Sequence, residues 1–305
     1  MCGFIGHLSF DKLNNDQIVK SNKLIECRGP DELINLEGQF SRLFDNKDKL
    51  NYSYVFNRLS ILDLSESASQ PMISQKFKSI LMFNGEIFNH KELRKDLIEN
   101  GIGFSSNHSD TEVLLNGISY FGISFIEKLI GQFSFAYYSS DLKKIYLGRD
   151  RLGQKPLFYY RDKNNIIFGS NLRAIAKNLN SAEIDTKSLS NYLNYGVVPS
   201  PDTIFKEIKK IEPASIIEFD PIESFKEKKY KYWQIDSFSN EKKFNPDKFF
   251  DLMNKSIEIR EEADVPIAYF LSGGIDSSSI VKNASERGNE LNTFSVGHSE
   301  KKYDE

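Results

Sequence analysis

The second residue of the chain has the properties of a catalytic nucleophile. Cys2 lies between the initiator methionine and Gly3 in the opening stretch MCGFIGHLSF. If Met1 is removed, Cys2 carries both a thiol and a free α-amino group, whose pKa of about 7.7–8.0 lets it act as general base for that thiol. Gly3 leaves room for a substrate beside the backbone. The alternative is a terminal cysteine that is merely buried or incidental.

A second candidate site is the glycine turn SGGIDSS near the end of the chain. It has no lysine, so it is not a Walker A loop, and it lacks the Gly-x-Gly-x-x-Gly fingerprint. Glycines let backbone N–H groups approach an anion, and a helix that follows would aim its N-terminus at the same place. Asp276 suits a Mg²⁺ ion that bridges phosphates. The candidate phosphate ligands are Ser272, Gly273, Gly274, Ser277 and Ser278.

Short strands and a few helices would position the terminal cysteine. Apolar and aromatic runs bounded by Asn, Asp, Gly and Ser predict strands at 3–10, 52–62, 79–84, 133–140, 144–150, 155–161 and 165–170. Helical patterns that follow polar capping residues occupy 91–100, after Asn89, and 110–122 and 172–179. Strands interleaved with helices predict sheets covered by helices.

The sequence changes character near residue 197. The stretch VVPSPDT at 197–203 predicts an exposed turn, and charged sequence of low hydrophobicity then runs to about residue 245. Within it, KEKKYKY at 226–232 is interpreted as a solvated loop. Residues 247–262 have the apolar spacing of an amphipathic helix, and the glycine turn follows in a strand, turn, helix, strand order. This order predicts the first βαβ unit of a parallel α/β domain, about a third of which is present.

Length and composition limit the class of protein. A chain of 305 residues favours two domains. The hydrophobic fraction of 39% and the net charge of −3 indicate a globular protein that has no nucleic-acid partner. The two cysteines, Cys2 and Cys27, cannot form a disulfide framework and favour a reducing compartment. No signal peptide or bilayer-spanning stretch is recognised, so we expect a soluble cytoplasmic protein with no membrane partner.

The motifs behind the terminal cysteine occur in the order of a known family. They are CRGPDE at 27–32, NRLSILDLS at 57–65, QPM at 70–72, FNGEIFNH at 83–90, SDTE at 109–112, LGRDRLGQKPLFYY at 147–160 and LSGGIDSS at 271–278. This series resembles the glutaminase domain and the ATP-pyrophosphatase loop of glutamine-dependent asparagine synthetases, over essentially the whole chain. His7 and Cys27 depart from the residues usual in that family, and Cys27 is interpreted as a packing residue.

The resemblance implies an α+β N-terminal nucleophile hydrolase domain, an αββα sandwich of two antiparallel sheets covered by helices. A partial α/β parallel-sheet ATP-pyrophosphatase domain, similar to the adenine nucleotide alpha hydrolases, would follow it. The expected boundaries are 1–213 for the glutaminase domain, 214–245 for a connecting segment and 246–305 for the start of the synthetase domain. Members of the family are usually homodimers.

The same resemblance assigns roles in glutamine binding and hydrolysis. Asn84 and Gly85 would form the oxyanion hole, Arg58 would hold the glutamine α-carboxylate, and Asp110 with Glu86 would receive the α-ammonium. Taken singly, these residues also fit a hairpin turn, a surface ion pair and a helix cap. The backbone expected to line the glutamine pocket is that of Leu59, Ser60, Ile61 and Leu62. The expected ATP ligands are Phe270, Ser272, Gly273, Gly274, Asp276, Ser277 and Val296.

The implied reaction is glutamine-hydrolysing asparagine synthesis. Ammonia released from glutamine would pass inside the protein to aspartate activated by ATP, which yields asparagine, glutamate, AMP and pyrophosphate, with Mg²⁺ at Asp276. Three alternatives stay open: an amidotransferase for another carboxylate, for example in surface-polysaccharide biosynthesis; a nucleotide-binding protein without turnover; and a glutaminase alone. From this length of chain we expect weak or absent asparagine formation.

Overall fold

The computed structural model describes residues 2–40, 49–235, 244–288, 290–297 and 300. These fall into two compact units, Met1–Ile235 and Asp236–Glu305.

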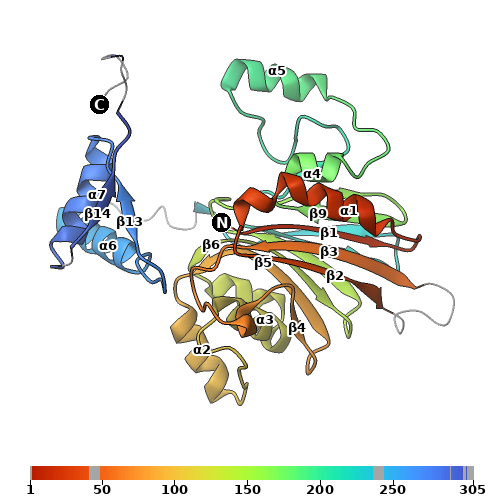
Figure 1. The fold of residues 1–305 in the computed structure, drawn as a ribbon, viewed down its shortest axis with the longest axis horizontal. Helices are drawn as coiled ribbons and strands as arrows, with labels where there is room; N and C mark the ends of the chain where they lie inside the picture. Colours follow the sequence, from red (N-terminus) through yellow and green to blue (C-terminus); the bar gives the residue numbers. More distant parts are fainter. Residues whose placement is uncertain (1, 41–48, 236–243, 289, 298–299, 301–305) are drawn as a thin grey trace. The chain divides into compact units, whose positions relative to one another are not determined.

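Two six-stranded antiparallel sheets form the centre of the first unit (Figure 1). The first sheet has the strand order β10-β8-β9-β1-β3-β2 and the second the order β12-β11-β7-β6-β5-β4. The strands of the first sheet are β1 (Gly3–Ser9), β2 (Glu32–Phe40), β3 (Leu50–Arg58), β8 (Phe158–Arg161), β9 (Asn165–Gly169) and β10 (Lys209–Lys210). The strands of the second are β4 (Met72–Ser74), β5 (Ser79–Ile87), β6 (Gly131–Ser139), β7 (Lys144–Arg149), β11 (Ser215–Asp220) and β12 (Lys226–Lys231).

An aromatic-rich core fills the space between the two sheets. Phe4 of β1 and Phe56 of β3 meet Met82 of β5 and Phe219 of β11 in one buried cluster. Successive side chains of a strand point to opposite faces, so the neighbour of Phe4, Ile5, packs on the outer face of the first sheet. Both faces of β1 are therefore covered, which explains its almost continuous burial.

Helices cover the outer face of each sheet (Figure 1). Leu93 and Leu114 lie in the cluster that covers the second sheet, and Ile18 and Ile175 lie in the cluster over the first. The predicted αββα sandwich of two antiparallel sheets is confirmed. The helices of this unit are α1 (Asn15–Ser21), α2 (His90–Glu99), α3 (Asp110–Phe121), α4 (Leu172–Ala176) and α5 (Thr186–Tyr195). Short 3-10 turns occupy Asn22–Leu24, Glu26–Arg28, Glu66–Ala68 and Ile123–Lys128.

Residues 215–231 extend the second sheet, in a region that we expected to be a connecting segment. β11 pairs with β7, and β12 pairs with β11 at the edge of the sheet. The solvated loop predicted for 226–232 is therefore wrong over its first six residues. Lysines on an edge strand keep the unpaired side from joining another strand, so a charged composition does not exclude a strand here.

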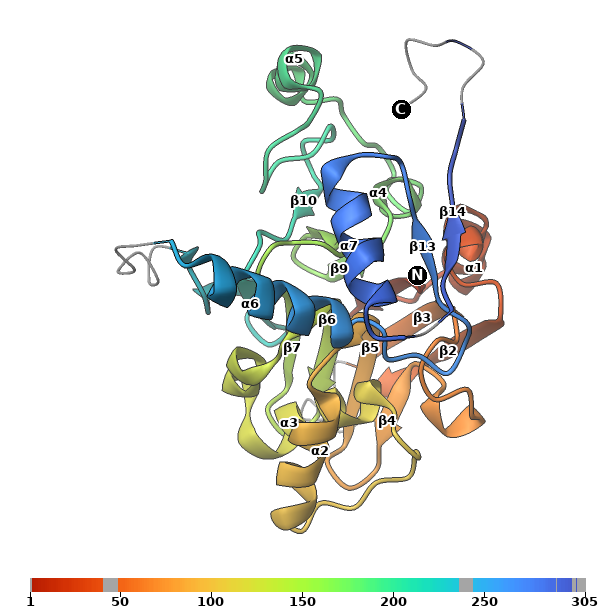
Figure 2. The same cartoon turned by 90° about the vertical axis from the view of Figure 1, so that its left-hand side faces the viewer.

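The second unit contains the predicted βαβ arrangement (Figure 2). β13 and β14 are parallel neighbours, with Ala268 opposite Asn292, and α7 connects them. The side chain of Asn245 accepts a hydrogen bond from the N–H of Lys248 at 3.1 Å and so caps α6. The elements of this unit are α6 (Pro246–Glu258), β13 (Ala268–Phe270), α7 (Ile275–Ser285) and β14 (Asn292–Phe294).

Candidate active site

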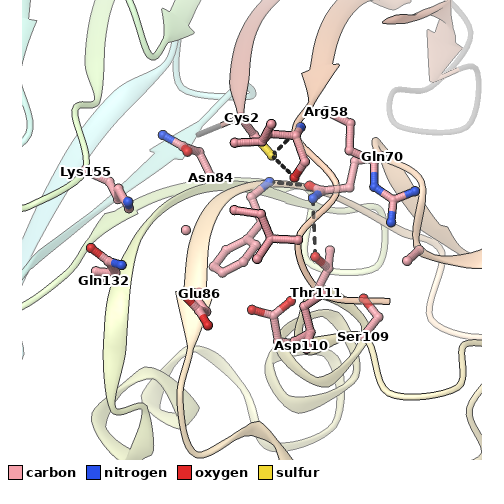
Figure 3. Close-up of a pocket in the computed structure, with 16 residues that line it drawn as sticks. Cys2, Arg58, Gln70, Asn84, Glu86, Ser109, Asp110, Thr111, Gln132 and Lys155 are labelled. Carbon is pink, nitrogen blue, oxygen red and sulfur yellow. Dashed lines mark hydrogen bonds between the residues drawn. The ribbon is translucent and has the colours of Figure 1, made fainter. Parts of the chain in front are cut away.

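A pocket of about 200 Å³ brings together residues from distant parts of the first unit (Figure 3). Cys2 precedes β1, Arg58 ends β3, Asn84 lies in β5 and Asp110 begins α3. β1 and β3 are antiparallel neighbours, so the start of one strand lies beside the end of the other. This pairing places the terminal cysteine next to Arg58.

The thiol of Cys2 is held by the backbone of Leu59. The Leu59 N–H donates to Sγ at 3.4 Å, and Sγ lies 3.7 Å from the Leu59 carbonyl oxygen (Figure 3). Arg28 Nε donates to the Cys2 carbonyl oxygen at 3.2 Å, which fixes the backbone. Burial raises the pKa of the Cys2 thiol, although the Leu59 hydrogen bond and the Arg58 charge act in the opposite direction. A protonated thiol needs a base before it can attack a carbonyl.

Asn84 lies in the wall of this pocket and has an unpaired amide. Its side chain is fully buried, and neither Nδ2 nor Oδ1 has a hydrogen-bond partner among the described residues. A buried amide without partners is rare in folded proteins, because it loses its hydrogen bonds to water without replacement. Its Nδ2 is thus an available donor for a negatively charged oxygen in the pocket.

Gly85 is required by the close approach of β6. A Cβ atom built on it would lie 2.2 Å from the Gln132 carbonyl oxygen and 2.6 Å from the Phe133 Cα. Its φ of 157° also lies where residues with a side chain are strained. The hairpin-turn alternative for Asn84-Gly85 is wrong, because both residues lie inside β5 and pair with β6.

The guanidinium of Arg58 is fixed at the pocket wall. It donates to the Ser65 carbonyl oxygen at 3.1 Å and to the Asp63 carbonyl oxygen, and Nη1 lies 3.6 Å from a Glu32 carboxylate oxygen. The ion pair considered for Arg58 is therefore present, with Glu32, but the Arg58 side chain is buried and does not lie on the open surface. A buried, oriented guanidinium is suited to bind a carboxylate.

Asp110 and Glu86 place two carboxyl groups in the same pocket. Asp110 accepts a hydrogen bond from the Ile87 N–H at 2.9 Å, and burial raises the pKa of its carboxyl group, against the effect of that hydrogen bond. A ligand ammonium group would favour the charged carboxylate. The pair therefore suits a cationic group of a substrate.

Other residues of the pocket were given no role from the sequence. Gln70 accepts from the Phe83 N–H at 2.7 Å and donates to Thr111 Oγ1 at 3.3 Å. Lys155 lies in the wall as well. Of the four backbone positions expected here, Leu59, Ile61 and Leu62 line the pocket. Ser60 does not line it: its N–H donates to Asp31 Oδ2 at 2.7 Å.

The glycine turn of the second unit leads from β13 into α7. Ser277 Oγ accepts from the Ser272 N–H at 3.2 Å, and Gly273 has a φ of 91°. The turn is exposed, as are Phe270 and Val296. Backbone N–H groups at the start of an eleven-residue helix suit a phosphate.

The described residues contain neither a clustered metal site nor a helix that could span a membrane. No group of three or more His, Cys, Asp or Glu side chains stands together as a metal site in that part of the chain. The helices that the structure describes are all too short or too polar to cross a bilayer.

Residues 1–233 match the family described as glutamine amidotransferase domain, and residues 248–305 match the asparagine synthase family. A protein of Methanocaldococcus jannaschii, provisionally named glutamine-hydrolysing asparagine synthetase 2, is 35% identical over 328 residues, covering 100% of this chain and 61% of its own. Glutamine-hydrolysing asparagine synthetase 1 of Bacillus subtilis is 33% identical over 310 residues, covering 100% of this chain and 47% of its own. The chain thus spans about half the length of these relatives.

A solved structure has the same fold. Glutamine phosphoribosylpyrophosphate amidotransferase from Bacillus subtilis superposes with a TM-score of 0.52 at 14% identity, covering 98% of this chain and 67% of that one. The match over residues 1–233 shows that the chain belongs to the glutamine amidotransferase domain family, and residues 248–305 are similar to the asparagine synthase family.

Proposed function

We propose that the first unit hydrolyses glutamine, with Cys2 as nucleophile. The observation that carries this proposal is the unpaired, buried amide of Asn84 in the pocket that holds the thiol. A structural asparagine would have its amide hydrogen bonded, whereas a donor kept for a transient oxyanion stays unpaired until the substrate binds.

The proposed reaction begins when the α-amino group of processed Cys2 takes the proton of its own thiol. The thiolate attacks the side-chain amide carbon of glutamine, and the oxygen that becomes negative receives hydrogen bonds from Asn84 Nδ2 and the Gly85 N–H. The α-ammonium group then returns the proton to the leaving nitrogen, which departs as ammonia. Water hydrolyses the thioester to give glutamate and to restore the thiol.

The glutamine backbone groups are bound at two sides of the pocket. Arg58 receives the α-carboxylate, since its guanidinium is already oriented by carbonyl oxygens. Asp110 and Glu86 receive the α-ammonium. These contacts leave the side-chain amide of the substrate for the thiol.

For the second unit we propose use of the ammonia in an ATP-dependent amidation, with aspartate as the acceptor. Ser272, Gly273, Gly274 and Ser277 would hold a phosphate group, and ATP supplies the activation of the acceptor carboxylate. Phe270 and Val296 are proposed to contact the nucleotide. Asp276 alone does not form a metal site among the described residues, so no step is assigned to Mg²⁺.

The oligomeric state and the cellular compartment of the protein are also proposals. Both cysteines are free, which suits a reducing compartment, and we propose a homodimer in the cytoplasm. Analytical ultracentrifugation measures the oligomeric state directly.

Glutamate formation from glutamine tests the proposed nucleophile. The wild-type protein should release glutamate and ammonia, and Cys2→Ala should abolish both while glutamine still protects the fold against heat. Mass spectrometry of the active protein should show Cys2 as the first residue. Undiminished hydrolysis by Cys2→Ala refutes the assignment. Pyrophosphate release in the presence of different carboxylates distinguishes aspartate from another acceptor.

A further inference from the structure

Lys155 is a buried amine in the wall of the glutamine pocket. It is only 7% exposed and lines the pocket together with Cys2 and Glu86. Figure 3 shows it on the same side of the pocket as Asn84 and Gln132. Lysine is almost never buried without a charge partner, so its place here calls for a reason.

The backbone on both sides of the Lys155 Cα is fixed by buried charged groups. Its N–H donates to Asp150 Oδ2 at 3.0 Å, and its carbonyl oxygen accepts from Arg149 Nε at 2.7 Å. Both of these side chains are buried. Lys155 lies in the connection between β7 and β8, and these two hydrogen bonds fix the backbone of that connection.

The same carboxylate connects this turn to the strand beside Gly85. Asp150 Oδ2 also accepts from the Phe133 N–H at 3.1 Å, and Phe133 lies opposite Gly85 in the β5–β6 ladder. One buried oxygen thus fixes both the lysine and the backbone that packs on the candidate oxyanion hole. The backbone from which the Lys155 side chain extends is therefore fixed relative to β6 before substrate arrives.

Electrostatics link the amine to the thiol. Burial lowers the pKa of Lys155, while the negative charges of Glu86 and ionised Cys2 act to raise it. Coulomb attraction is mutual, so a charged Lys155 stabilises a thiolate at Cys2. The charged groups that act on this pair are the chain's α-amino group, Arg28, Arg58, Glu86, Asp110 and Asp150.

We propose that Lys155 is a positioning residue for the nucleophile: its ammonium group balances the carboxylate of Glu86 and favours the thiolate of Cys2. Without it, the carboxyl groups of Glu86 and Asp110 would face the sulfur and the developing oxyanion with one positive side chain fewer in the pocket wall. This inference rests on the proposed hydrolysis of glutamine and adds a residue to it.

Alkylation of Cys2 by iodoacetamide as a function of pH tests the inference without requiring turnover. All variants carry Cys27→Ser, because Cys27 is exposed, so that the packing role expected for it is wrong, and it would react as well. In Lys155→Met the midpoint of the alkylation curve should move to higher pH, and the rate near pH 7 should fall roughly three- to tenfold. The rates should converge at high pH, where the thiol is ionised in every variant. Lys155→Arg keeps the charge and should restore most of the rate.

Lys210→Met is the matched control. Lys210 is also partly buried, its pKa is likewise lowered by burial, and its Nζ donates to the Val198 carbonyl oxygen at 3.0 Å, but it lies outside the Cys2 pocket. The alkylation curve of Lys210→Met should match that of the parent protein, which carries Cys27→Ser alone.

A Lys155→Met curve that coincides with the parent curve overturns the inference, and so does an equal shift in Lys210→Met. If circular dichroism shows that Lys155→Met is unfolded, Lys155→Gln takes its place with the same expected shift. Glutamine hydrolysis is measured in parallel. Its absence from the wild type would refute the proposed function, whereas the alkylation curves decide on Lys155 in either case.

Discussion

A Cβ atom on Gly85 would lie 2.2 Å from the carbonyl oxygen of Gln132 in the neighbouring strand. The obstacle is backbone, which cannot swing away as a side chain would, so β5 and β6 must separate to admit a methyl group. We predict that Gly85→Ala lowers the free energy of unfolding by roughly 1–3 kcal/mol. It should also lower glutamine hydrolysis at least about 100-fold, because the oxyanion donors move.

Urea unfolding and a glutamate assay measure both effects. Gly103→Ala serves as control, since no atom lies within 4 Å of its Cβ position. The control should hydrolyse glutamine at the wild-type rate. A Gly85→Ala protein with wild-type stability would contradict the close contact.

Asn84→Ala should separate activity from stability. Its buried amide has no partner among the described residues, so its removal breaks no hydrogen bond and relieves the unfavourable burial of a polar group. We predict an unfolding midpoint equal to or above that of the wild type, together with a loss of about 100- to 1000-fold in kcat. Asn116→Ala, which removes a donor to the Gly103 carbonyl oxygen at 3.4 Å, should instead reduce stability and spare kcat. An Asn84→Ala variant that is clearly less stable but active would speak against an oxyanion donor.

The sequence predicts the sandwich core better than its edges. Runs of apolar residues such as 3–10 and 133–140 predict strands correctly, because strands buried on both faces are continuously apolar. The edge strands β2 and β12 escape this prediction, since their exposed faces carry Glu, Asn or Lys and resemble loops. The inner strand β11 escapes it as well, although it is mostly buried, because its short apolar run lies in a stretch of charged sequence. Edge strands lack the composition on which strand prediction depends.

Hydrogen bonds at the ends of helices are also determined by tertiary structure and cannot be predicted from the local sequence alone. Asn89 was predicted to cap the helix at 91–100, yet its side chain makes no capping bond. Its amide donates to the Lys128 carbonyl oxygen at 3.0 Å and accepts from the Ile130 N–H at 2.9 Å. Lys155 and Gln70 lie in quoted motifs, but only folding brings them to the thiol. Sequence spacing cannot reveal such a contact.

Asp110→Asn should change the pH dependence of stability. Burial raises the pKa of Asp110, so the folded protein binds that proton more tightly than the unfolded chain does. The contribution of Asp110 to the free energy of unfolding therefore falls as the pH rises from the ordinary pKa of a carboxyl group to the raised pKa of the folded state. We predict that the variant is more stable than the wild type near pH 7 and that the difference shrinks toward about pH 4, where an ordinary carboxyl group takes up its proton.

The same variant should bind glutamine more weakly. Loss of the charge that faces the α-ammonium should raise KM roughly 10- to 100-fold. Thermal unfolding at several pH values and steady-state kinetics measure the two effects, with the exposed Asp96→Asn as control. A stability difference that grows as the pH falls would show that the sign is wrong.

Asp150 should be among the most sensitive positions for stability. Its buried carboxylate accepts hydrogen bonds from four backbone N–H groups, those of Leu152, Gln154, Lys155 and Phe133. Asp150→Ala would leave buried donors without an acceptor, each at a cost of about 1–3 kcal/mol, so we expect a loss of roughly 3 kcal/mol or more in urea unfolding.

A second loop carboxylate, Asp162, provides the comparison. It also accepts from two backbone N–H groups, of Asn164 and Asn165, both at 2.8 Å, but it is only partly buried, so water can replace it. Asp162→Ala should therefore lose only about 1 kcal/mol. Because Asp150 also anchors Lys155 and the strand beside Gly85, its variant should lose glutamine hydrolysis even at temperatures where it remains folded. Equal losses of stability in the two variants would mean that burial does not set the strength of these contacts.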